Sequence, residues 1–317
     1  MKTLLSVLIF CIVLFIYLHI HFHLKISNDL EVYEIEQPSK EKLEEICDIR
    51  QPVIFDYNVD GLLNECNIDS MENKYGAFDV KVRNVKEYDD TSELHLPLTL
   101  NTAREIFRKD TEERYISENN TEFLEETGLV KIIRYNDNFL RPYSVSNCIY
   151  DVQFSSKDTK TPLTYELNYR NFYLVTQGSV KIKLIPPKSS KYLYTIKDYD
   201  NFEFLSPVNP WNVQSQFKTD FDKLKTLEVE LKQGQIIYIP AYWWHSFHYT
   251  ENSSICIFKY KTYMNNLAIS NHLFVNMLQS QNVKRNVVNT KITVGDADYT
   301  DLRNTVENTV ENTSLKE

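Results

Sequence analysis

The 317-residue sequence has little glycine (6 residues), and its five cysteines follow no metal-binding or disulfide spacing. Cys11 lies in an apolar run, while Cys47, Cys66, Cys148 and Cys256 stand apart from one another. Basic residues are fewer than acidic ones: the chain has 35 Lys and Arg and 44 Asp and Glu, which gives a net charge of −9. A nucleic-acid-binding protein presents a clustered basic surface, so the composition argues against nucleic acid as a partner.

The first 25 residues form a predicted transmembrane anchor. Residues 4–20 contain no charged side chain, and the apolar character extends to Leu24. A helix of about 20 residues spans a bilayer core of roughly 30 Å. The alternative is a cleaved signal peptide, which has a shorter apolar core of about 7–15 residues and small residues at its cleavage site. The bulky Phe, Tyr and His residues after Val13 favour the anchor.

The sequence leaves the side of the membrane open. Lys2 and Lys25 flank the apolar run, so the positive charges are nearly balanced. The short N-terminal segment favours a lumenal or external position for the rest of the chain. We therefore expect a single-pass membrane protein that contacts the bilayer through residues 4–24.

The remaining chain divides into four predicted segments. Residues 26–37 are polar and acidic and form a predicted stalk, and residues 38–265 form one domain. Residues 266–295 form a predicted helical extension. Residues 296–317 carry polar Asn-Thr-Val-Glu repeats and are predicted to be disordered.

Two helix starts are predicted at the beginning of the domain. Ser39 is a predicted N-cap, followed by Leu43, Ile46 and Cys47 on one helical face. Thr102 fits a capping box for a second helix. A predicted strand, residues 51–55, follows the first helix.

Most of the domain is predicted to consist of short β-strands. Apolar and β-branched residues flank Gln177-Gly178 within residues 161–187, and flank Gln233-Gly234 within residues 227–239. Such runs, interrupted by a single glycine, predict two β-hairpins. Residues 147–154 and 254–260 add further strands, so we expect a mainly β barrel or jelly roll with flanking helices.

Three segments resemble one known family. Thr161 to Glu166 (TPLTYE) resembles the family pattern T-P-L-H-Y-D, and Asn171 follows it. Residues 178–187 and 234–245 resemble G-x-K-x-x-x-L-x-P-P and G-D-x-x-Y-I-P-x-x-W-W-H. These are patterns of the cupin-like JmjC proteins, relatives of Fe(II)- and 2-oxoglutarate-dependent asparaginyl and lysyl hydroxylases. The resemblance covers about residues 38–265 and implies a double-stranded β-helix. Because related enzymes dimerise through helices at this end, it also implies that residues 266–295 either mediate a homodimer or pack on their own domain.

The resemblance also implies a metal site that this chain has partly lost. Non-haem iron enzymes hold Fe(II) with two His and one carboxylate. The first family His aligns with Thr164, the carboxylate with Glu166 and the second His with His245. An ungapped alignment from Gly178 puts the pair on Tyr165 and Leu167 instead, so neither register keeps H-x-D. His245 is then either a ligand in a degenerate triad or a histidine kept for packing.

The implied cosubstrate site has a separate loss. Family enzymes bind the far carboxylate of 2-oxoglutarate with a cation two residues after the glycine, and here that position is Val180. Lys181 and Lys183 are expected to point to the other face of the strand. A buried carboxylate beside Val180 would be left without a partner. Asn171 is the one cosubstrate-binding residue that the resemblance still predicts.

We therefore predict a membrane-anchored, catalytically degenerate cupin-like protein, a pseudoenzyme that needs no cofactor. Its pocket would bind or scaffold a protein or glycan partner. The alternative is an Fe(II)- and 2-oxoglutarate-dependent protein hydroxylase with an atypical metal site built on Glu166 and His245. A structural component of a virus particle is a third class, which rests on composition and the anchor.

Overall fold

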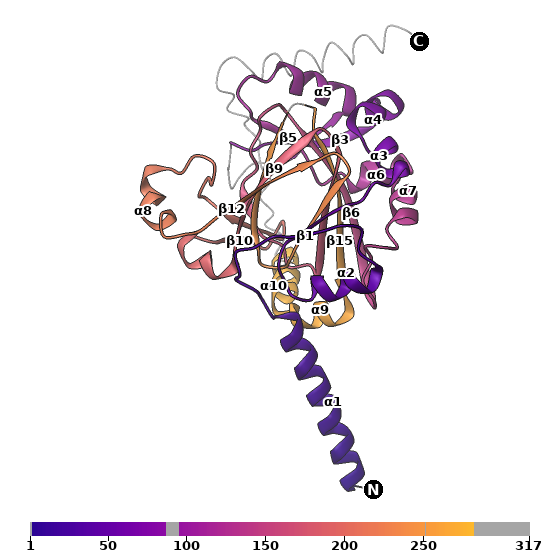
Figure 1. Cartoon of the computed structure of the whole chain (residues 1–317), viewed down its shortest axis with the longest axis vertical. Coiled ribbons are helices and arrows are strands. Elements are labelled where there is room, and N and C mark those ends of the chain that lie inside the picture. The colour runs from indigo at the N-terminus through magenta and orange to yellow at the C-terminus, as the bar shows by residue number, and fades with distance from the viewer. Residues whose placement is uncertain (1, 87–94, 251, 282–317) are drawn as a thin grey trace. The chain divides into compact units, whose positions relative to one another are not determined.

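The structure, a computed structural model, describes residues 2–86, 95–250 and 252–281 and contains two β-sheets that face each other (Figure 1). The larger sheet has the order β1 (Tyr33–Ile35), β2 (Val53–Asp56), β13 (Gln235–Ile239), β8 (Arg170–Gln177), β15 (Ser254–Thr262), β6 (Val145–Ser155), β5 (Tyr115–Ser117), β3 (Asp79–Asn84) and β4 (Leu96–Thr99). The smaller sheet has the order β10 (Ile196–Asp198), β11 (Glu203–Ser206), β7 (Leu163–Thr164), β14 (Trp244–Tyr249), β9 (Ser179–Ile185) and β12 (Leu227–Lys232).

Helices cover the outer face of the larger sheet, so this sheet is buried on both sides (Figure 1). They are α2 (Lys40–Cys47), α3 (Asp60–Glu65), α4 (Ile68–Tyr75), α5 (Leu100–Lys109), α6 (Thr121–Glu126) and α7 (Leu129–Asn136). Leu62, Phe107 and Phe123 from these helices pack against Phe154 and Phe258 of the sheet. The short elements η1 (Pro187–Tyr192), η2 (Ser215–Phe217) and α8 (Lys218–Phe221) connect strands of the smaller sheet. The predicted mainly β fold with flanking helices is confirmed.

A second apolar cluster fills much of the space between the sheets. Tyr173 and Ile257 contribute from the larger sheet, and Val180, Ile182 and Tyr249 contribute from the smaller one. Each of these side chains is almost fully buried. This cluster holds the two sheets together.

The prediction of two hairpins was wrong. β8 and β9 follow one another in the chain but lie in different sheets, and so do β12 and β13. Each turn carries the chain from one sheet to the other, at Gly178 with φ of 73° and Gly234 with φ of 85°. Runs of apolar and β-branched residues around a glycine predict buried strands and a turn, but they do not show which strands pair with one another. The sequence pattern is therefore the same for either pairing.

The two turns are joined by main-chain hydrogen bonds and depend on their glycines. Gly234 N donates to Val175 O over 2.9 Å, and Gln233 N donates to Gly178 O over 3.1 Å. A Cβ atom on Gly234 would lie 1.9 Å from Asn58 Oδ1. The positive φ favours glycine there, and a larger residue would also have to displace the Asn58 side chain.

Helix α1 (Lys2–His23) coincides with the predicted anchor and has no buried residue. It is long and apolar enough to cross a membrane, a test that an N-terminal signal sequence also passes. Its last turn contacts the domain, because His23 Nε2 lies 3.2 Å from Thr262 Oγ1 and Arg50 lies over the Phe22 ring. The segment that follows is not simply a stalk, since β1 joins the larger sheet beside β2.

The helix predictions were partly correct. Ser39 caps α2, and its hydroxyl accepts a hydrogen bond from Lys42 N over 3.2 Å. The predicted start at Thr102 was wrong, because α5 begins at Leu100 and its N-cap is Thr99. The C-terminal extension begins with α9 (Tyr263–Ala268) and α10 (Ser270–Gln281). The rest of the extension and the predicted disordered tail, residues 296–317, lie outside the described residues.

Candidate functional site

A row of residues across the smaller sheet places Thr164 and His245 in the interior. Ile196 pairs with Leu205, Leu205 with Thr164, Thr164 with His245, and His245 with Leu184. Residues directly opposite one another in neighbouring strands point to the same face. Leu184 belongs to the cluster between the sheets, so the whole row faces the larger sheet. His245 stands near the start of β14.

The larger sheet contributes Lys259, Asn171 and Tyr173 to the same interior. Lys259 on β15 is the partner of Asn171 on β8, and Tyr173 lies two residues further along β8 on the same face. Tyr173 belongs to the inter-sheet cluster, which fixes the direction in which all three side chains point.

Glu166 forms an ion pair with Lys259. Glu166 follows β7 and lies outside any strand, and its Oε1 accepts a hydrogen bond from Lys259 Nζ over 2.6 Å. Its Oε2 accepts another from Asn168 Nδ2 over 3.1 Å. The side chains of Glu166 and Lys259 are 29% and 21% exposed, so the pair is only partly shielded from water.

The pair favours the charged form of both groups. Burial is the largest single effect and disfavours both charges, but the attraction and the hydrogen bond between the two groups, with smaller contributions from their neighbours, together outweigh it. The pKa of Glu166 is consequently lowered, and the pKa of Lys259 is raised. The carboxylate that the resemblance assigns to a metal therefore already has a cationic partner.

His245 is neutral and has hydrogen-bonding partners at both ring nitrogens. Nδ1 lies 3.2 Å from the carbonyl oxygen of Trp243, and Nε2 lies 3.1 Å from the hydroxyl of Tyr173. Since a carbonyl only accepts, Nδ1 carries the proton and Nε2 accepts from Tyr173. Burial lowers the pKa of His245 to about 4. The lone pair that would bind a metal thus already accepts a hydrogen bond.

Asn171 is fully buried, and both ends of its amide have protein partners. Its Nδ2 donates to Ile239 O over 3.2 Å, and its Oδ1 accepts from Asn168 Nδ2 over 3.1 Å. Asn168 therefore links Asn171 to Glu166. The predicted cosubstrate residue lies beside the predicted metal residues, and in this structure it holds the loop after β7 to the larger sheet.

These donors do not fit an Fe(II) site. Over residues 2–86, 95–250 and 252–281, no group of three His, Cys, Asp or Glu side chains is arranged to hold a metal ion. Glu166 is paired with an ammonium, and the aligned position of the first His is the hydroxyl of Thr164. Usual non-haem iron sites need three protein ligands.

The position of the family's cosubstrate cation is packed with apolar side chains. Val180 is fully buried and contacts the cluster that contains Ile182 and Leu231. Burial alternates along β9, so Lys181 and Lys183 lie on its other face, as expected. Lys183 Nζ donates there to Pro210 O and lies over the Trp211 ring.

Three residues of the site were not predicted: Lys259, Asn168 and Tyr173. A signal for Lys259 was present, because Ile255, Ile257 and Lys259 alternate along β15 and the two isoleucines belong to the inter-sheet cluster. Lysine at the next inward position of a buried strand calls for an acidic partner. Asn168 lies in an irregular loop, and its sequence context gave no comparable signal.

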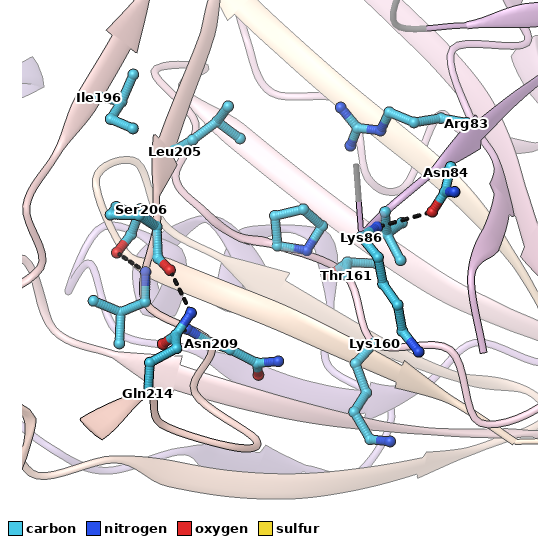
Figure 2. A pocket seen from close by; sticks show the side chains of 14 residues that line it. Arg83, Asn84, Lys86, Lys160, Thr161, Ile196, Leu205, Ser206, Asn209 and Gln214 are labelled. Atoms are coloured by element: carbon cyan, nitrogen blue, oxygen red, sulfur yellow. Dashed lines mark hydrogen bonds between the residues drawn. The ribbon is translucent and has the colours of Figure 1, made fainter. Parts of the chain in front are cut away.

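A cavity of about 330 Å³ lies at the edge of the same interior (Figure 2). Ile196 and Leu205, which begin the row containing Thr164 and His245, form part of its lining. Arg83 from β3 and Lys160, just before β7, also line it. The cavity and the polar site therefore share one face of the smaller sheet.

Comparison with known proteins identifies the domain. The family model of the cupin-like domain matches residues 38–262. HSPB1-associated protein 1 of Mus musculus is 29% identical over 76 residues, 24% of this chain and 16% of that protein. The Homo sapiens protein of the same name gives the same figures, and that of Bos taurus is 28% identical over 86 residues, 27% of this chain and 18% of that protein. The match thus spans less than a fifth of the length of these relatives.

Proposed function

The chain belongs to the cupin-like domain family, and we propose that it is a non-catalytic binding or scaffolding module of that family. In this proposal, the family's metal and 2-oxoglutarate sites no longer operate, and α1 holds the module at a membrane. The observation that carries the proposal is the 2.6 Å ion pair between Glu166 and Lys259.

An ammonium beside the carboxylate opposes metal binding for two reasons. A divalent cation would have to displace Lys259 from Glu166, and it would then lie close to a second positive charge in a shielded site. The remaining aligned donor, His245, would also have to give up its hydrogen bond from Tyr173. Thr164 has no imidazole, so it supplies no third ligand that would offset the loss of the ion pair and of this hydrogen bond.

The cosubstrate position supports the same proposal. A keto-acid carboxylate next to Val180 would meet an apolar cluster and would lose its hydration without gaining a cation. Lys259 is a cation in the interior, but its charge is already balanced by Glu166. 2-Oxoglutarate would therefore have to break an existing ion pair in order to bind.

We further propose a protein partner in preference to a glycan. The rodent, bovine and human relatives carry a name that records association with another protein, HSPB1. A homodimer is a second proposal, and α10 supports it with exposed Phe274, Met277 and Leu278. The mass of the purified chain in detergent tests the homodimer directly.

The full-length protein in detergent tests the absence of catalysis. We expect no saturable Fe(II) binding in calorimetry and no succinate from 2-oxoglutarate. A matched variant, Thr164→His with Lys259→Met, supplies an imidazole and removes the ammonium, and it should bind Fe(II). Stoichiometric Fe(II) binding and succinate formation by the unmodified chain, lost in Glu166→Ala or His245→Ala, would instead establish the hydroxylase alternative.

A further inference from the structure

The cavity in Figure 2 has a positively charged side and an apolar side. Lys86 and Lys160 lie on one side, and Ile196 and Leu205 lie opposite them. None of the described residues that line the cavity is acidic. The whole chain has a net charge of −9, so a cavity lining that contains two lysines and no acidic residue differs from the composition of the protein.

The ammonium groups of the two lysines are available to form ion pairs with a ligand. Lys160 Nζ lies 2.7 Å from Glu113, but the two side chains are 29% and 42% exposed. A pair in such a position contributes only about 0–1 kcal/mol and is easily exchanged. The ammonium of Lys86 donates to the main-chain carbonyl of Glu112, a neutral acceptor that leaves the charge in place.

Arg83 has a different role in the same wall. It is buried and forms ion pairs with Glu118 and with Glu203 from β11 of the opposite sheet. Its guanidinium is therefore held by two carboxylates and ties the two sides of the cavity together. The charges offered to a ligand are those of the lysines.

The opposite wall is preformed. Gln214 Oε1 accepts a hydrogen bond from Asn209 N over 3.1 Å, and Gln214 Nε2 donates to Pro207 O over 2.9 Å. These bonds fix the loop after β11 in shape. Ile196 on β10, the strand partner of Leu205, is 37% exposed although it is apolar. A rigid wall with an exposed apolar side chain reduces the entropy lost on binding.

We propose that this cavity binds an acidic peptide segment of the protein partner, with carboxylates at Lys86 and Lys160 and an apolar side chain against Ile196 and Leu205. The proposal rests on the proposed function, because it names the class of partner that the module binds. The volume of about 330 Å³ suits one or two side chains. Phosphate recognition favours a free arginine fork, and the fork of Arg83 is engaged by protein carboxylates.

The experiment measures fluorescence anisotropy of a labelled Glu-Glu-Leu-Glu-Glu peptide with the full-length protein in detergent. We expect saturable binding that weakens as salt screens the charges, and weaker binding of the matched Gln-Gln-Leu-Gln-Gln peptide. The double variant Lys86→Gln and Lys160→Gln removes two partly exposed ion pairs between the protein and the peptide, and it should raise the Kd about 10-fold.

Two further variants separate this site from a general charge effect. Glu113→Gln releases Lys160 from its internal carboxylate and should tighten binding about 2- to 5-fold. Lys74→Gln breaks a similar surface pair with Glu65, away from the cavity lining, and should leave the Kd unchanged. A merely structural role of Lys160 would not give opposite effects in Lys160→Gln and Glu113→Gln.

Three results would overturn the inference. They are equal Kd values for the two peptides, equal effects of the cavity and Lys74 variants, and displacement of the peptide by inorganic phosphate at concentrations where free glutamate has no effect. The succinate assay is scored separately. If the acidic peptide fails to bind to a chain that forms no succinate, this inference falls while the proposed lack of catalysis stands.

Discussion

The two ends of the space between the sheets deal with charge in opposite ways. At one end Val180, Ile182 and Tyr249 are fully buried in an apolar cluster. At the other end Glu166 and Lys259 retain full charges, and each is the partner of the other. A charge in such an interior is tolerated when it is paired and costs several kcal/mol when it is not.

This contrast shows that two positions which differ from the family pattern need not have the same surroundings. Val180, aligned with the family's cation, lies in an apolar cluster. Thr164, aligned with the family's first His, lies near a carboxylate that is balanced by Lys259 from the opposite sheet. An aligned carboxylate therefore does not by itself indicate a metal.

The sharpest way to break the comparison is to place a charge at the apolar end. Val180→Lys buries an unpaired ammonium, and we expect it to lower the free energy of unfolding by about 4 kcal/mol or to prevent folding. Denaturant unfolding of the full-length protein in detergent measures this. Lys181→Val, on the outward face of the same strand, is the control and should change the stability by less than about 0.5 kcal/mol. A stable Val180→Lys variant would mean that water or an anion reaches this position.

The next largest effect is expected from removing one partner at the polar end. Lys259→Met leaves Glu166 as an uncompensated carboxylate, and we expect a loss of about 3 kcal/mol of unfolding free energy. The pair is not fully shielded, which puts the loss at the lower end of the range for buried pairs.

A double-mutant cycle then isolates the interaction between the two charges. Adding Glu166→Gln to Lys259→Met removes the stranded charge, and most of the lost stability should return. Additive losses in the double variant would show that Lys259 acts through packing alone. They would remove the main support for the proposal that Lys259 takes the place of a metal ion beside Glu166.

The strands and turns of the fold could be predicted from the sequence, but the pairing of the strands could not. Runs of apolar and β-branched residues in 170–185 and 227–239 identified the strands, and Gly178 and Gly234 identified the turns. The pairing was wrong because such runs indicate buried strands and not the sheet to which each strand belongs. The start of α5 was also missed, since Thr99 and Thr102 are both acceptable caps and the structure uses the first.

Only the site residues at positions aligned with the family pattern could be predicted from the sequence. The structure does place Thr164 and His245 opposite one another and brings Glu166 and Asn171 together through Asn168. Lys259 lies 93 residues beyond Glu166, and no local pattern indicates which carboxylate it meets. The hydrogen bond from Tyr173 to His245 also joins the two sheets, so it depended on the pairing that was predicted wrongly.

The smallest of these effects concerns His245 and appears only as a pH dependence. In the unfolded chain this imidazole has its ordinary pKa of 6.5, whereas burial lowers its pKa to about 4 in the folded protein. Between these values the unfolded chain binds the extra proton, so stability falls as the pH falls, by about 2 kcal/mol between pH 6.5 and 5. Asp151, whose pKa burial raises to about 6, acts in the opposite direction, and it is present in every variant. The difference between the original chain and His245→Gln therefore isolates the histidine. If that difference is independent of pH, the pKa of His245 is the same in the folded and unfolded chains, and burial does not hold the ring in the neutral form that accepts the hydrogen bond from Tyr173.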